Sequence, residues 1–344
     1  IGRSAGTGGT GNKSENTAVG KDALLAITTG GSNTALGSTA GDALTTGAQN
    51  VFLGYAAGGA TTDVDNAICI GPSAGAANMT SAADGTIAIG YAALNANLSG
   101  RYNTAVGYAA LKTNVDGDFN TAIGYKALET FEAADAEGEN TAVGYQAMQG
   151  ATLGIENTAV GKDALGAGTL TGDRNTALGI NTLANQTGGE RNIAIGAYAF
   201  DAAANAENDN IAIGVDALGN MNNADSDQNI AIGNYAGDGI GTIGGLDNIF
   251  MGFHSGGGTW AGVDSTRNIG IGNYALAGPM NAATSNMAVG GAALANVTTG
   301  DHNVALGDQA LNDLTTGSRN IAIGGLAMDA ADGAESDNIA IGYD

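Results

Sequence analysis

The chain has 344 residues, 59 of them glycine, and its 34 acidic and 11 basic side chains give a net charge of −23. This charge argues against nucleic acid and anionic membrane surfaces as partners, because both are themselves negative. No apolar run approaches the roughly 18 residues of a membrane-spanning helix, so we expect no membrane insertion.

A pentad that ends in glycine recurs nineteen times, at a spacing of 17 to 20 residues. Asparagine opens 17 of the 19 copies. The second position is usually Thr, Ile or Val, the third is usually Ala, and the fourth is usually Val, Ile or Leu. Such alternation is typical of a short β-strand. The expected strands lie, in chain order, at 16–20, 33–37, 50–54, 67–71, 86–90, 103–107, 120–124, 140–144, 157–161, 175–179, 192–196, 210–214, 229–233, 248–252, 268–272, 286–290, 303–307, 320–324 and 338–342.

A short fixed period predicts an all-β chain, because a unit this small cannot bury a core alone and must stack on its neighbours. Recurrent Gly and Asn disfavour helix in every repeat. We expect a parallel β-solenoid, or β-roll, of about 19 coils of 17–20 residues. Residues 1–344 are expected to form a single repeat domain. Both ends fall in mid-repeat, so we expect an excerpt of a longer fibre.

Stacked coils place equivalent residues about 4.8 Å apart, so that each position of the repeat forms a column. The asparagine column is predicted to be a structural ladder of side chains bonded to one another and to the next coil's backbone. The aliphatic strand residues and a leucine four residues after many of the glycines are predicted to form the core. The alanine column indicates close approach of the opposite wall of the coil or of another chain. Representative ladder residues are Asn16, Asn33, Asn103, Asn120, Asn192 and Asn320.

The phrase Asn-x-Ala-Ile-Gly-x-x-Ala resembles the head repeats of YadA-like trimeric autotransporter adhesins and similar repeats in phage tail fibres. The full spacing of that family's motif is matched by residues 66–71, Asn-Ala-Ile-Cys-Ile-Gly. The resemblance covers nearly the whole chain and implies a parallel β-roll that forms a homotrimer. It also implies a role in adhesion and an extracellular location, on a cell surface or a virion.

Acidic residues gather between the pentads, for example at 132–139 and at Asp225 and Asp227. One interpretation is a solvated, self-repelling surface that prevents the rods from sticking together. The alternative is calcium binding at these loops, with Asp225 and Asp227 as ligands, because carboxylate oxygens on flexible loops suit that ion. Otherwise the sequence predicts no cofactor.

The coil at 248–267 is irregular and holds three candidate ligand-binding residues, Phe253, His254 and Trp260. Aromatic rings beside polar groups suit a cell-surface glycan or receptor. The alternative is local repacking, in which Phe250 fills a gap opposite Gly270 and Trp260 covers the loop. Four tyrosines at 91, 108, 125 and 145 follow the glycine in successive coils and predict a structural stack.

No cluster of residues suits catalysis, since the chain has two histidines in separate repeats, one cysteine and no Gly-x-Ser-x-Gly. We therefore expect no enzyme. The leading hypothesis is a structural and adhesive fibre segment, from a phage tail fibre or a bacterial surface adhesin, that gives reach and multivalent attachment. The alternative is a subunit of a self-assembling extracellular filament or sheath. The threonine row also fits an ice-binding face, although the row is interrupted and its neighbours are aliphatic.

Overall fold

The computed structural model describes residues 2–8, 11, 14–132, 138–166, 169–203, 205–330 and 333–343. The chain divides into two compact units, residues 1–171 and 172–344, and each is described by itself. Each unit is a parallel β-solenoid, which confirms the predicted fold class. Each expected pentad contains one three-residue strand.

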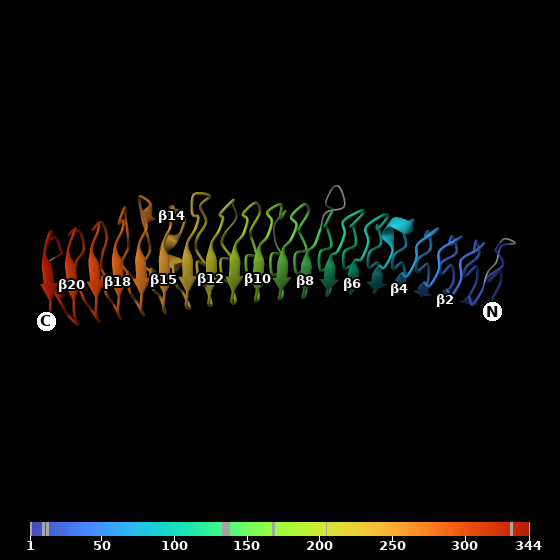
Figure 1. The fold of residues 1–344 in the computed structure, drawn as a ribbon, viewed down its shortest axis with the longest axis horizontal. Coiled ribbons are helices and arrows are strands. Elements are labelled where there is room, and N and C mark those ends of the chain that lie inside the picture. Colours follow the sequence, from blue (N-terminus) through green and yellow to red (C-terminus); the bar gives the residue numbers. More distant parts are fainter. Residues whose placement is uncertain are drawn as a thin grey trace. The chain divides into compact units, whose positions relative to one another are not determined.

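In residues 1–171, nine strands stack in parallel, each paired with the next one along the chain (Figure 1). Equivalent positions of the repeat are in register, so that Ala105 is opposite Ala122. The elements are β1 (Thr17–Val19), β2 (Thr34–Leu36), β3 (Val51–Leu53), β4 (Ile68–Ile70), the 3₁₀ turn η1 (Ser81–Ala83), β5 (Ile87–Ile89), β6 (Thr104–Val106), β7 (Thr121–Ile123), β8 (Thr141–Val143) and β9 (Thr158–Val160).

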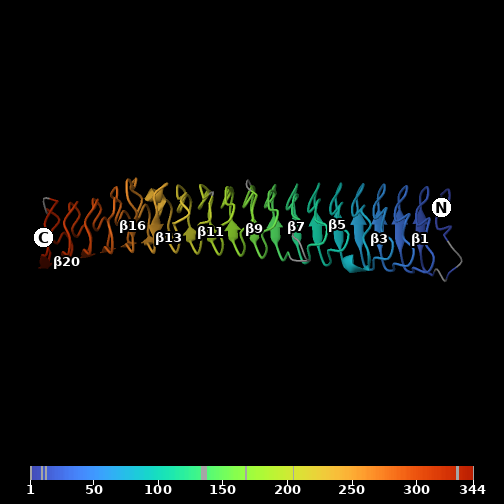
Figure 2. The same ribbon diagram turned by 90° about the horizontal axis from the view of Figure 1, so that it is seen from above.

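Residues 172–344 repeat the pattern with ten such strands and one additional two-stranded pairing, β14 with β16, in the loops (Figure 2). The elements are β10 (Thr176–Leu178), β11 (Ile193–Ile195), β12 (Ile211–Ile213), β13 (Ile230–Ile232), the 3₁₀ turn η2 (Asp238–Ile240), β14 (Gly245–Leu246), β15 (Ile249–Met251), β16 (Ser265–Thr266), β17 (Ile269–Ile271), β18 (Met287–Val289), β19 (Val304–Leu306), β20 (Ile321–Ile323) and β21 (Ile339–Ile341).

The interior of each coil is narrow and is filled from both walls. The middle strand residue, such as Ala105, is fully buried, and so is the leucine four residues after the closing glycine, such as Leu111. The leucine was predicted correctly. The prediction that the aliphatic strand residues form the core is wrong, since the first and third residues of each strand face outward. The middle strand residue is usually alanine because the leucine on the opposite wall of the same coil leaves room for only a methyl group.

Two coils show this volume limit directly. Where Phe52 replaces the middle alanine, the leucine position is glycine in its own coil and in the preceding one, at Gly58 and Gly41. A Cβ at Gly58 would lie 2.5 Å from Cδ1 of Phe52, and one at Gly41 would lie 2.6 Å from Cδ2. Phe250 has the same arrangement with Gly237 and Gly256. A large residue on one wall is therefore matched by glycine on the other.

The closing glycine is required for two reasons. Gly196 has φ of +136°, a backbone conformation that L side chains rarely adopt. A Cβ on Gly196 would also lie 2.3 Å from the carbonyl oxygen of Gly214 in the next coil. The corner therefore needs glycine both for its turn and for the close stacking of the coils.

The asparagine column forms the predicted ladder. The amide of Asn192 donates from Nδ2 to Oδ1 of Asn175 at 3.1 Å and to the carbonyl of Glu207 at 2.8 Å. Its own Oδ1 accepts the backbone N–H of Asn210 at 3.0 Å. At Asn16, Asn33, Asn103, Asn120 and Asn320 the side-chain oxygen likewise accepts the backbone N–H that opens the next pentad, and the amide donates to a loop carbonyl. Asn16 is half-buried and the other four are fully buried. Buried amides that are bonded on all sides tie each coil to its neighbours.

Candidate functional site

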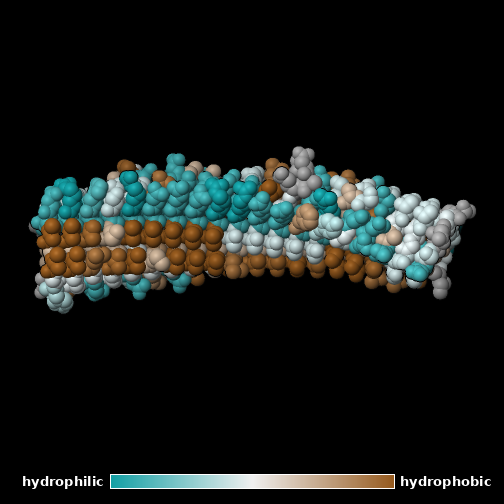
Figure 3. Space-filling view, in the orientation of Figure 1, coloured by the Kyte–Doolittle hydropathy of each residue, from teal (hydrophilic) through white to brown (hydrophobic). Residues whose placement is uncertain are grey.

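The outward face of the strands forms a uniform surface in each unit, made of the first and third residues of every triplet. In residues 172–344 both rows are almost wholly aliphatic, and Leu178, Met251 and Ile271 are among the exposed members. Figure 3 shows them as two brown rows. In residues 1–171 the first row is threonine in six strands and aliphatic in three, whereas the third-residue row is aliphatic throughout.

This outward face excludes charge. None of the nineteen triplets contains Asp, Glu, Lys or Arg, so all 34 acidic residues lie elsewhere in the chain. Thr121 and Ile211 are both half-buried within the chain. The two units therefore differ in the chemistry of the first row rather than in its exposure. A contiguous, uncharged and largely apolar surface is a candidate site of contact with another molecule.

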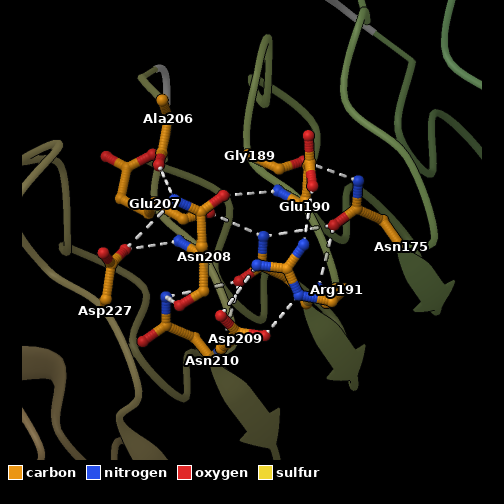
Figure 4. A network of polar contacts seen from close by, with 11 residues as sticks. Asn175, Gly189, Glu190, Arg191, Ala206, Glu207, Asn208, Asp209, Asn210 and Asp227 are labelled. Atoms are coloured by element: carbon orange, nitrogen blue, oxygen red, sulfur yellow. Dashed lines mark hydrogen bonds and ion pairs between the residues drawn. The ribbon is translucent and has the colours of Figure 1, made fainter.

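A second ladder runs through the loops, two positions before the asparagine column. Here a side-chain oxygen accepts the backbone N–H of the equivalent residue in the preceding coil. Asp227 accepts from Asn208 at 2.6 Å, and Asn208 in turn accepts from Glu190 at 2.9 Å (Figure 4). The same bond is made by Asp65, Asp84, Asp118, Asp301 and Ser318. Acidic loop residues in this column are therefore structural acceptors.

Asp227, one of the two predicted calcium ligands, belongs to this ladder. One oxygen of Asp227 is already engaged by a backbone N–H, whereas Asp225 is exposed and donates its own N–H to Oδ1 of Asn223 at 2.8 Å. Within the described ranges, no three His, Cys, Asp or Glu side chains gather where they could hold a metal ion. Part of the acidic stretch at 132–139 lies outside the described residues.

Ion pairs between successive coils add to these bonds. The guanidinium of Arg191 donates to both oxygens of Asp209, at 2.6 and 2.9 Å, and to Glu190 at 2.6 Å (Figure 4). Arg191 lowers the pKa of the Asp209 carboxyl, chiefly through the hydrogen bond between them. Arg319 and Asp337 repeat this two-bond arrangement at the same position of a later coil. Both pairs are exposed and so contribute little to stability.

The structure brings together two of the three candidate ligand-binding residues. Phe253 and His254 have ring centroids 6.1 Å apart, and Tyr274 contacts both rings, at 5.4 and 5.6 Å. Trp260 lies elsewhere, packed edge-on against Phe250 at 5.9 Å, and it is only 5% exposed. Phe250 is also in register with Gly270, as the repacking alternative predicts. Trp260 lines a cleft of about 350 Å³ with polar residues that sequence reasoning missed.

The four tyrosines after the glycines form the predicted stack. Successive rings of Tyr91, Tyr108, Tyr125 and Tyr145 lie 5.1, 5.3 and 5.2 Å apart and are nearly parallel. Each inner ring stacks against both of its neighbours, so its faces are covered although the residues are partly exposed. The row is therefore a stabilising stack rather than a set of open aromatic platforms.

No protein-family model matches this chain, and no curated protein is significantly similar to it in sequence. Within the part of the chain that the structure describes, no helix is long and apolar enough to cross a membrane.

Proposed function

We propose that this chain is a structural fibre segment that assembles with copies of itself through the outward face of its strands. The observation that carries the proposal is the pair of uncharged rows on residues 172–344, which are aliphatic on nearly every strand. A chain that carries a net charge of −23 keeps this one face free of charge. Self-repulsion of the acidic loops would direct association to that face.

The area of the face agrees with a contact between copies. A three-residue strand is about 10 Å long and strands lie about 4.8 Å apart, so ten strands present about 500 Å². This is at the upper end of the roughly 300–600 Å² found for the largest apolar patch of a monomer. Two such faces together would bury about 1,000 Å², which is the lower limit for a specific interface between proteins.

The resemblance to trimeric adhesin and tail-fibre repeats supports a homotrimer and an extracellular role in attachment. In such a fibre the solenoid would supply reach, and repetition along it would supply many weak contacts. The alanine column does not contribute to this proposal, because it faces the interior of its own coil.

Light scattering of the whole chain tests the proposal. We expect a mass that is a small multiple of 33.5 kDa. The double variant Ile213→Lys/Ile232→Lys places two charges on neighbouring strands of the face and should give the mass of a single chain. The control Ala206→Lys/Ala224→Lys adds the same charge at exposed loop positions and should leave the mass unchanged. Circular dichroism checks that all three proteins fold.

A wild-type chain that stays monomeric at all concentrations would exclude self-assembly. If the variant Ile213→Lys/Ile232→Lys remains assembled, the contact between copies lies on another surface. Mass that grows without limit as the concentration rises would favour the open filament over the closed trimer.

A further inference from the structure

The irregular coil that follows β15 forms one wall of a cleft in residues 172–344, and the two preceding coils form the rest. The cleft has a volume of about 350 Å³. This is at the lower end of the range of small-molecule sites, about 300–1,000 Å³. It is lined by two glycines, at 239 and 241, and by Asn220, Asp238, Thr242, Thr259 and Trp260.

The lining is rich in hydrogen-bonding groups. The amide of Asn220 is exposed and donates from Nδ2 to the backbone oxygen of Asp238 at 3.2 Å. Thr242 and Thr259 bring exposed hydroxyl groups. The indole Nε1–H of Trp260 is buried and bonds to no acceptor among the described residues. An unpaired donor of this kind on an otherwise buried side chain is uncommon in folded proteins.

Asp238 is the one ionisable residue in the lining. Its burial raises the pKa of the carboxyl, which His254 opposes and Asp216 reinforces. As a carboxylate, Asp238 accepts hydrogen bonds from a partner and repels anions. With no Lys or Arg in the lining, phosphate and carboxylate ligands have no counter-charge.

From this lining we propose that the cleft binds a neutral saccharide ring. Vicinal hydroxyl groups of such a ring both donate and accept, which suits a carboxylate, an amide and two threonine hydroxyls within one small cleft. The largely buried indole of Trp260, which also lines the cleft, provides an apolar contact for the carbon atoms of the sugar ring. A purely apolar ligand would leave these polar groups unpaired, so the lining selects against it.

Trp260 makes the test direct, because it is the single tryptophan of the chain and its fluorescence reports on this cleft alone. The full-length protein is titrated with glucose, galactose and N-acetylglucosamine, with their methyl glycosides, and with glucuronate as the anionic probe. We expect a saturable emission change with at least one neutral sugar, at a Kd of about 1 mM. Glucuronate should bind about tenfold more weakly than glucose, because Asp238 repels it.

Matched variants locate the binding. Asp238→Asn and Asn220→Ala should each weaken it about tenfold or more, as expected when a hydrogen bond to the ligand is lost. The chain offers an equivalent pair in an earlier coil, where Asn185 donates to the backbone oxygen of Asp201 at 2.7 Å. Asp201→Asn and Asn185→Ala should leave binding unchanged. Thr259→Ala changes an exposed residue of the lining and should also weaken sugar binding. Circular dichroism verifies that each variant folds.

The methyl glycosides distinguish two sources of the ligand. Equal binding of a sugar and its methyl glycoside indicates the terminal residue of a glycan chain, whereas binding of the free sugar alone indicates a soluble sugar; both support the cleft as a saccharide site. The proposal is overturned by the absence of a saturable response to every neutral sugar. Equal losses in the cleft and control variants, or glucuronate binding as tight as that of glucose, would also overturn it.

Discussion

Oδ1 of Asn192 accepts hydrogen bonds from both the backbone and the side-chain amide of Asn210, at 3.0 and 3.3 Å. Asn210 uses its own oxygen in the same way toward Asn229. Asn210 is thus a donor to one coil and an acceptor for the next, and it is fully buried.

Asn210→Ala should destabilise the protein by about 2–4 kcal/mol, because it leaves the backbone N–H of Asn229 and the carbonyl of Ser226 without their partners. Asn296→Ala removes an exposed amide of the same unit that bonds to the carbonyl of Asn312. It should cost less than about 0.5 kcal/mol. The midpoint of urea unfolding measures the loss of stability in each variant. Equal losses in the two variants would show that the buried ladder contributes no more to stability than an exposed amide does.

Phe52→Ala should cost about 3–5 kcal/mol, because a buried ring is replaced by a methyl group. Adding Gly41→Leu and Gly58→Leu to this variant restores the usual pairing of alanine with leucine and should recover most of the loss. The two leucines without Phe52→Ala should instead be strongly destabilising, since their Cβ atoms alone would overlap the ring. Thermal unfolding of the three variants tests whether the walls compensate each other in volume.

Glu207→Gln should stabilise the fold at neutral pH. Glu207 is buried, one of its oxygens has no partner among the described residues, and burial raises its pKa above the usual 4.5. A raised pKa in the folded state means that folding favours the protonated form, so stability falls as the pH rises through this range. The variant should gain stability at about pH 7 and gain little at about pH 3, where the wild-type carboxyl is largely protonated in both the folded and the unfolded state.

Unfolding midpoints at the two pH values measure this difference. The control Asp225→Asn alters an exposed carboxylate of the same unit and should show no such dependence on pH. If Glu207→Gln gains the same stability at both pH values, the gain comes from packing and not from the ionisation of the buried carboxyl.

Cys69 should be inert in the folded protein. It is fully buried, and burial raises the pKa of its thiol to about 12. A thiol reagent at about pH 8 should label it only after unfolding, because the thiolate is the reactive form. Cys69→Ala should cost less than about 1.5 kcal/mol, since alanine occupies this column in fifteen coils. Rapid labelling of the native protein would show that the coil around Cys69 opens readily.

The sequence was sufficient to predict the columns but not the direction in which they face. Alternation at Thr104, Ala105 and Val106 implies two faces of a strand, and a hydrophobicity scale assigns the larger aliphatic residue to the core. In a coil this narrow the choice depends instead on the volume left by Leu111 on the opposite wall, which the strand itself does not encode. The pairing of Phe52 with glycines at the leucine position was the available signal.

The cleft and the loop ladder were missed for a different reason. Asn220, Asp238 and Thr259 come from three successive coils, in segments whose lengths vary, so that no fixed spacing joins them. Trp260 was singled out as an aromatic residue of the irregular coil at 248–267, together with Phe253 and His254, and not through any link to these lining residues. Acidic residues such as Asp227 were interpreted as a surface or a metal site, although their constant distance from the next asparagine predicts a structural column.

The asparagine ladder also has a direction. In residues 172–344 every pentad opens with asparagine, so each coil presents the same amide oxygen to the coil that follows and the same N–H donors to the coil that precedes. A complete coil inserted or deleted within a unit would therefore find matching partners on both sides, as long as a full period is added or removed. The number of coils can therefore change by duplication or loss without redesign of the asparagine ladder, so that length can change in evolution while these buried contacts are kept.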